Sequence, residues 1–160
     1  MRHWYILFLI VFLFFSGCAQ LSSPYSKGEK LFKQEKFEEA KAEFEKAIEQ
    51  GENVYLAKVY LGRIYAIQGD IKKSIQILKE AKNSSPKSPD AYYFLGIVYQ
   101  FETRYREAEA CLDKVANMPG FGKAFAIAPV QIPYGPDAGQ PLSKGKKQFF
   151  IEVLKGKAFK

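Results

Sequence analysis

The chain has 160 residues, of which 48% are hydrophobic and 26% are charged, a balance typical of globular proteins and not of disordered or membrane-embedded ones. A net charge of +7 is compatible with binding to nucleic acids or to anionic membranes. Whether it indicates such a partner depends on where the charged residues lie in the chain. The one histidine, His3, and the one tryptophan, Trp4, lie at the amino terminus.

The amino terminus resembles an export signal. Residues 4–15 form an uninterrupted apolar run that follows Arg2. A helix of this length rises only about 18 Å, and a membrane span requires about 20 residues, so a secretory signal fits better than a transmembrane helix. The run ends in Phe-Ser-Gly-Cys, which resembles the lipobox of bacterial lipoproteins and implies a signal peptide over residues 1–17 and a lipidated Cys18. The alternative is an uncleaved anchor that ends in a cysteine by chance.

The lipobox resemblance also implies a location. Cys18 would carry a diacylglyceryl thioether and an amide-linked acyl chain such as palmitate, and several acyl chains make a stable anchor. Ala19 and Gln20 follow, and the aspartate that often retains such proteins in the inner membrane is absent. The expected location is therefore the bacterial cell envelope, at the outer membrane facing the periplasm. Cys111 is left without a partner for an intramolecular disulfide, and it is either a partly buried helix residue or pairs with another protein.

An internal repeat of 34 residues follows the signal. Each repeat has a glycine, then a leucine or tyrosine three residues later, a small residue twelve later and a large apolar residue sixteen later. These positions are Gly28, Gly62 and Gly96; Leu31, Tyr65 and Tyr99; Ala40, Ser74 and Ala108; and Phe44, Leu78 and Leu112. The pattern resembles the tetratricopeptide repeat, with repeats at about 21–54, 55–88 and 89–122 in a domain spanning residues 18–122.

This repeat predicts an all-α fold, a helical-hairpin array or α-solenoid of three repeats. The glycine and the small residue let two antiparallel helices approach closely, and the large residue fills the space beside them. Pro24 stands where the family favours an aromatic residue, so the opening helix of the first repeat is expected to be short. A coincidental amphipathic bundle is the alternative.

The repeat pattern stops before the last part of the chain, a mostly irregular extension over residues 123–160. Its first half is rich in proline and glycine, and a short helix is expected over residues 146–155, with Phe149 and Val153 on one face and Phe150 as a further candidate for that face. A strand over residues 149–154 is the alternative.

The charge excess belongs to this extension. Residues 18–120 carry 16 basic and 15 acidic side chains, whereas residues 121–160 carry seven lysines and two acids. The sequence therefore argues against a nucleic-acid partner. The lysines either touch anionic head groups beside the lipid anchor or form a solvated polar end.

The sequence contains few of the residue patterns that catalysis requires. Without the signal the chain has no histidine, which excludes Ser-His-Asp and Cys-His nucleophile systems and removes the commonest zinc ligand. The glycines stand at repeat positions and not in phosphate-binding loops. We therefore expect a binding protein that is not an enzyme and uses no metal and no cofactor.

The resemblance assigns partner binding to a concave groove lined by the first helix of each repeat. The residues carried over are Tyr25, Glu29, Phe32 and Lys33 from the first repeat, Val59, Arg63, Ala66 and Ile67 from the second, and Tyr93, Ile97, Gln100 and Phe101 from the third. Such an aromatic and aliphatic trough suits an amphipathic helix or an extended peptide.

Two features qualify this groove. Arg63 near its middle could hold a carboxylate bidentately, but the lysine and asparagine clamp of some relatives is replaced by Tyr25 and Glu29. Alternatively, tail residues 121–134 fold into the groove and fill it.

The predicted function is that of a lipid-anchored periplasmic adaptor, which binds a partner protein or peptide in its groove. It would scaffold an envelope complex such as outer-membrane assembly, pilus or cell-wall machinery. The alternative is a ligand-binding or cell-wall-acting module whose activity depends on the carboxy-terminal tail.

Overall fold

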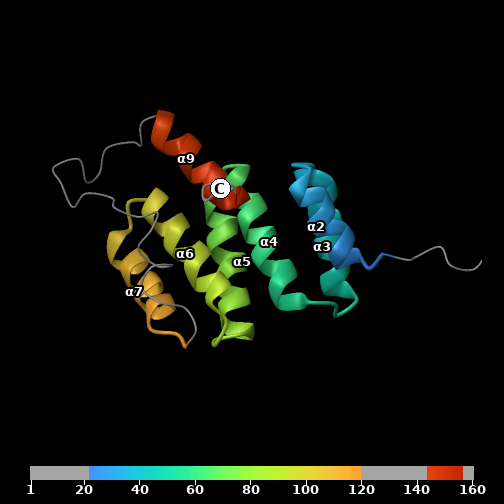
Figure 1. Ribbon diagram of the computed structural model, residues 1–160, viewed down its shortest axis with the longest axis horizontal. Helices are drawn as coiled ribbons and strands as arrows, with labels where there is room; N and C mark the ends of the chain where they lie inside the picture. The colour runs from blue at the N-terminus through green and yellow to red at the C-terminus, as the bar shows by residue number, and fades with distance from the viewer. Residues whose placement is uncertain (1–21, 120–143, 157–160) are drawn as a thin grey trace, which may run out of the picture.

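The computed structural model describes residues 22–119 and 144–156, and within these ranges it contains α-helices and no strands. The repeats form helical hairpins that stand side by side, each packed on the next (Figure 1). The hairpins are α2 (Pro24–Lys33) with α3 (Phe37–Glu49), α4 (Val54–Ile67) with α5 (Ile71–Ser84), and α6 (Pro89–Phe101) with α7 (Tyr105–Ala116). The predicted all-α hairpin array is confirmed.

The two helices of each hairpin touch at the repeated glycine. A Cβ atom built on Gly28, Gly62 or Gly96 would lie within 2.8, 2.5 or 2.7 Å of side-chain carbons of Phe44, Leu78 or Leu112, respectively. These distances are too short for real Cβ contacts, so the large residue of the second helix occupies the space that the glycine leaves free. In the second repeat, the Ser74 hydroxyl also donates a hydrogen bond to the Gly62 carbonyl oxygen at 2.7 Å.

The opening helix of the first repeat is short, as predicted. It has 10 residues, compared with 14 in α4 and 13 in α6. Ser23 caps it by accepting a hydrogen bond from the Ser26 amide, and Pro24 occupies the first turn, where no intrahelical donor is needed. Within the described residues, no helix is both long and apolar enough to span a membrane.

The turn inside each hairpin places one residue in the left-handed backbone region. These residues are Glu35 (φ 60°), Gly69 (φ 88°) and Thr103 (φ 58°), which are 34 positions apart. Glycine adopts this conformation freely, whereas a β-branched residue such as threonine is strained in it.

We expect Thr103→Gly to raise the free energy of unfolding by about 0.5–1 kcal/mol, because relief of the strain exceeds the added chain entropy of glycine. Denaturant unfolding followed by circular dichroism would measure it. The reciprocal change, Gly69→Thr, should lower stability by about 1 kcal/mol or more. Stabilisation by both substitutions would contradict the assignment of strain to this turn position.

The carboxy-terminal helix α9 (Lys144–Lys155) lies across α4 and α6 (Figure 1). The predicted helix over residues 146–155 is thereby confirmed, beginning two residues earlier, and the strand alternative is wrong. The predicted facing was partly wrong: Phe150 and Val153 are buried, but Phe149 is 49% exposed. The signal segment with Cys18, and most of the extension, lie outside the described residues.

Candidate partner-binding surface

The twelve predicted groove residues lie on α2, α4 and α6, and we call the face that carries them the inner face. Half of these side chains are buried, five are half-buried and Lys33 is exposed. The buried ones are Phe32, Val59, Arg63, Ala66, Tyr93 and Ile97. This burial corrects the expectation of an open apolar trough. Side chains of the array and of α9 cover much of the inner face.

Helix α9 covers the inner face with an aromatic residue and two aliphatic ones. The Phe150 ring stacks on that of Phe101 with centroids 4.2 Å apart and an interplanar angle of 20°. Val153 and Leu154 are 3% and 0% exposed, in one hydrophobic cluster with Ala66 and Ile97 of the array. The tail thus occupies part of the surface through α9, whereas residues 121–134, which the sequence offered as an alternative occupant, lie outside the described residues.

Arg63 lies at the centre of the covered region and is 8% exposed. Its Nε donates a 2.8 Å hydrogen bond to the carbonyl oxygen of Leu154, in the last turn of α9. The guanidinium carbon lies 4.5, 4.9 and 4.4 Å from the ring centroids of Phe32, Tyr60 and Phe94, respectively. Burial lowers the pKa of Arg63, and the nearby Tyr60 opposes this shift. The predicted carboxylate partner is replaced by the carbonyl end of a helix, whose dipole also favours a cation.

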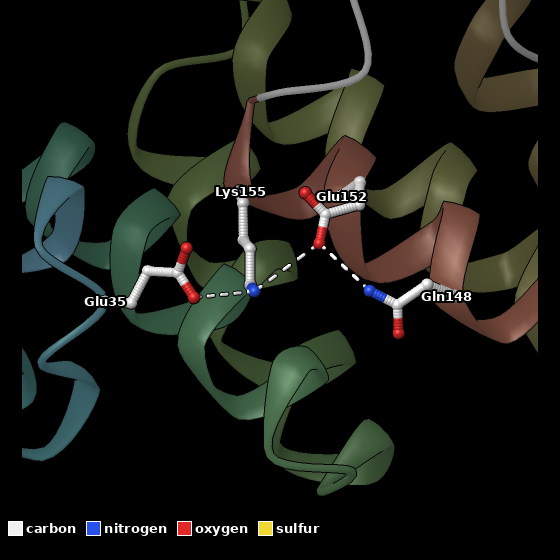
Figure 2. Close-up of polar contacts among 4 residues, drawn as sticks. All are labelled: Glu35, Gln148, Glu152 and Lys155. Carbon is white, nitrogen blue, oxygen red and sulfur yellow. Dashed lines mark hydrogen bonds and ion pairs between the residues drawn. The ribbon is translucent and has the colours of Figure 1, made fainter.

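Lys155 joins α9 to the first repeat. Figure 2 shows its Nζ between the carboxylates of Glu35 and Glu152, at 2.7 and 3.5 Å, with Gln148 donating to Glu152. The hydrogen bond to Glu35 raises the pKa of the Lys155 amine. This pair lies at the surface, so its contribution to stability is about 1 kcal/mol or less.

Tyrosine hydroxyls on α4 pair with carboxylates on the neighbouring helices α2 and α6. The Tyr60 hydroxyl donates to Glu29 Oε1 at 2.9 Å, and the Tyr55 hydroxyl donates to Asp90 Oδ2 at 3.3 Å. Burial, assisted by Glu29, raises the pKa of Tyr25. Burial raises the pKa of Tyr55 to about 12. These hydroxyls are therefore neutral donors at neutral pH.

The raised tyrosine pKa values predict alkaline destabilisation. An unfolded tyrosine ionises near pH 10, whereas Tyr55 in the folded chain holds its proton to about pH 12. Because the folded state keeps protons that the unfolded state releases, stability is complete below pH 10 and falls as the pH rises from 10 to 12. Denaturant midpoints at pH 9 and pH 11 would measure the loss, and Tyr55→Phe should reduce it. An unchanged midpoint would contradict the assignment.

Two of the three aromatic residues around Arg63, Tyr60 and Phe94, were missed by sequence reasoning, whereas Phe32 was among the predicted groove residues. Tyr60 and Phe94 are 34 residues apart, so they hold the same position in successive repeats, and this shared register was a signal that could have identified them. No comparable signal pointed to the backbone carbonyl of Leu154, because a backbone atom leaves no trace in residue type.

The described residues offer little for metal or thiol chemistry. Across residues 22–119 and 144–156, no group of three or more His, Cys, Asp or Glu side chains is placed to hold a metal ion. Cys111 is half-buried on α7, which agrees with the expected helix residue, and burial raises the pKa of its thiol. A raised pKa makes the reactive thiolate scarcer at neutral pH.

Comparison with known proteins agrees with this architecture. Tetratricopeptide repeat family models match residues 25–91 and 89–119, which together cover all three hairpins. Searches of curated proteins and of solved structures gave no match. The matched segments coincide with the hairpins and with the 34-residue spacing of their glycines, and the chain therefore belongs to the tetratricopeptide repeat family.

Proposed function

We propose that this protein is a lipid-anchored adaptor of the bacterial envelope, which binds a partner protein on its inner face. Tetratricopeptide repeats are typically non-catalytic scaffolds for protein–protein interaction, and both family matches support that general role. The single observation that carries the proposal furthest is the seating of α9, because the inner face already holds a helical segment through aromatic, aliphatic and polar contacts.

The envelope location rests on the lipobox-like sequence that ends at Cys18. We propose attachment to the outer membrane, facing the periplasm, because Ala19 and Gln20 follow the cysteine. In that position the adaptor would serve an assembly such as outer-membrane, pilus or cell-wall machinery.

The lipid anchor can be tested directly. We expect the unaltered chain to incorporate labelled fatty acid and to fractionate with membranes, and Cys18→Ser to lose both properties. Cys111→Ser is the matched control, since it removes the other cysteine, on α7, and should change neither. A Cys18→Ser chain that still takes up the label would rule out the lipobox interpretation.

Partner binding requires a different test. A photo-reactive phenylalanine analogue at Tyr25, half-buried on the inner face, should crosslink one defined envelope protein in cells. The same analogue at Lys72, exposed on α5, should not capture it. Equal capture at both positions would argue against the inner face as the binding surface.

A second candidate function is a ligand-binding or cell-wall-acting module that depends on the tail. The observation that favours it is the burial of Phe150, Val153 and Leu154 against the array, which makes the tail part of the folded unit. If Tyr25 captures no protein while loss of the tail abolishes binding to isolated cell wall, this candidate replaces the adaptor.

A further inference from the structure

Helix α9 binds the array as a separate ligand would. It is 12 residues long, and isolated helices of this length are marginal in water, so its helicity depends on the surface beneath it. Among the side chains of α9 that the structure describes, from residue 148 onward, the buried ones are Phe150, Val153 and Leu154, at spacings i, i+3 and i+4. Amphipathic helices bind grooves of partner proteins through a narrow apolar stripe of this kind.

The surface beneath α9 has a polar recognition element of its own. The Arg63 guanidinium is held between the rings of Phe32, Tyr60 and Phe94, which all belong to the array. The array therefore supplies the rings that flank it, and its Nε donates to the carbonyl of Leu154 on α9. The last carbonyls of any helix lack intrahelical partners, so Arg63 selects the carboxy-terminal end of a helix and fixes its direction.

A charged contact adds to this selection. Glu35, in the turn after α2, accepts from Lys155, which directly follows Leu154. A bound helix is thus recognised by an aromatic residue, two aliphatic residues and a basic residue at i, i+3, i+4 and i+5. None of these contacts requires a covalent link to the array.

We propose that the inner face of α4 and α6 is a receptor for a short amphipathic helix of this pattern on a partner protein. Helix α9 is its intramolecular occupant, which the partner helix displaces. This inference rests on the proposed adaptor role and names the ligand class. Because α9 is covalently attached to the array, its effective concentration at this surface is on the order of millimolar. A partner helix must therefore bind tightly or be presented at high local concentration.

The test uses the chain from residue 18 onward with Cys18→Ser, in three forms. One keeps α9 unaltered, one carries Phe150→Asp, and the matched control carries Phe149→Asp. These neighbouring phenylalanines differ in burial, at 8% and 49% exposure, so only Phe150→Asp should free the surface. The probe is a fluorescent synthetic peptide with the sequence of residues 143–160, and its binding is followed by fluorescence anisotropy.

We expect the Phe150→Asp chain to bind the peptide at least tenfold more tightly than the unaltered and Phe149→Asp chains, about 1.4 kcal/mol or more. A peptide carrying Phe150→Asp should bind none of them. Equal affinity of the three chains for the unaltered peptide would overturn the proposal. Circular dichroism must show that the Phe150→Asp chain keeps its helices, and Val153→Asn, which disrupts the same interface from another residue, supplies an independent second variant.

The Arg63 contact has its own readout. Adding Arg63→Met to the Phe150→Asp chain should weaken peptide binding about tenfold, because the helix end loses its donor. Arg63→Lys should restore little, since an ammonium lacks the planar face that stacks between rings. Unchanged affinity in Arg63→Met would overturn the assignment of Arg63 as the determinant of helix direction.

These outcomes are separable from those of the proposed function. The peptide experiment needs neither a membrane nor a cellular partner. A negative lipid-labelling result would therefore contradict the envelope location without affecting the peptide-receptor proposal. A negative peptide-binding result would contradict the receptor proposal without affecting the lipid anchor.

Discussion

Replacing Phe44 with alanine is expected to lower the free energy of unfolding by about 4 kcal/mol. The ring is fully buried on α3, over Gly28. It stacks on Tyr60 of α4, with centroids 4.9 Å apart, and lies 5.9 Å from the ring of Tyr25. Alanine would leave a cavity where the first repeat joins the second.

A loss of this size would shift the melting temperature of the array by about 15–30 °C, since each kcal/mol moves a domain of this length by roughly 4–8 °C. Thermal and urea unfolding followed by circular dichroism would measure it. Phe44→Leu should cost less than half as much, because leucine refills most of the cavity. Phe149→Ala is the matched control at an exposed site and should change stability by less than about 0.5 kcal/mol. A Phe44→Ala chain that melts within a few degrees of the unaltered chain would contradict the role of Phe44 as the central residue of this junction.

The second large effect is expected at Gly62, where alanine should lower stability by about 2 kcal/mol. The added Cβ would lie 2.5 Å from Cγ and 2.7 Å from Cδ2 of Leu78, which is fully buried. The two helices must separate, or Leu78 must leave its rotamer. The higher helix propensity of alanine offsets at most about 1 kcal/mol of this cost.

A double-mutant cycle tests the cause. Leu78→Ala alone should cost about 2–5 kcal/mol by leaving a cavity. The pair Gly62→Ala with Leu78→Ala should cost clearly less than the sum of the two single changes, because the new methyl enters the space that Leu78 vacates. Additive effects would show that Gly62 and Leu78 do not share one site.

The repeat array could be predicted because its determinants are local and recur. Gly28, Gly62 and Gly96 mark the same close approach in each hairpin, and the large residue sixteen positions later contacts each of them. Both the helix pairs and their internal packing follow from spacing within a single repeat. Where the pattern of one repeat is weak, the equivalent positions of the other two repeats still identify its helices.

The seating of α9 could not be predicted in this way. It occurs once in the chain, and it joins residues 91 positions apart at Arg63 and Leu154. Phe149 and Phe150 are chemically identical neighbours, and only the surface beneath the helix decides which one is buried. Resemblance assigned partner binding to the first helix of each repeat, but the cover that α9 provides could be found only from three-dimensional information.

The sequence separation of the α9 contacts has a consequence for the order of folding. Each hairpin joins neighbouring helices through short turns, whereas Lys155 reaches Glu35 across 120 positions. Local contacts form quickly, and distant ones bear the greater entropic cost of loop closure. The hairpins are therefore expected to form first and α9 to dock on them afterwards. Until α9 docks, the inner face of a folding molecule is open to other helices.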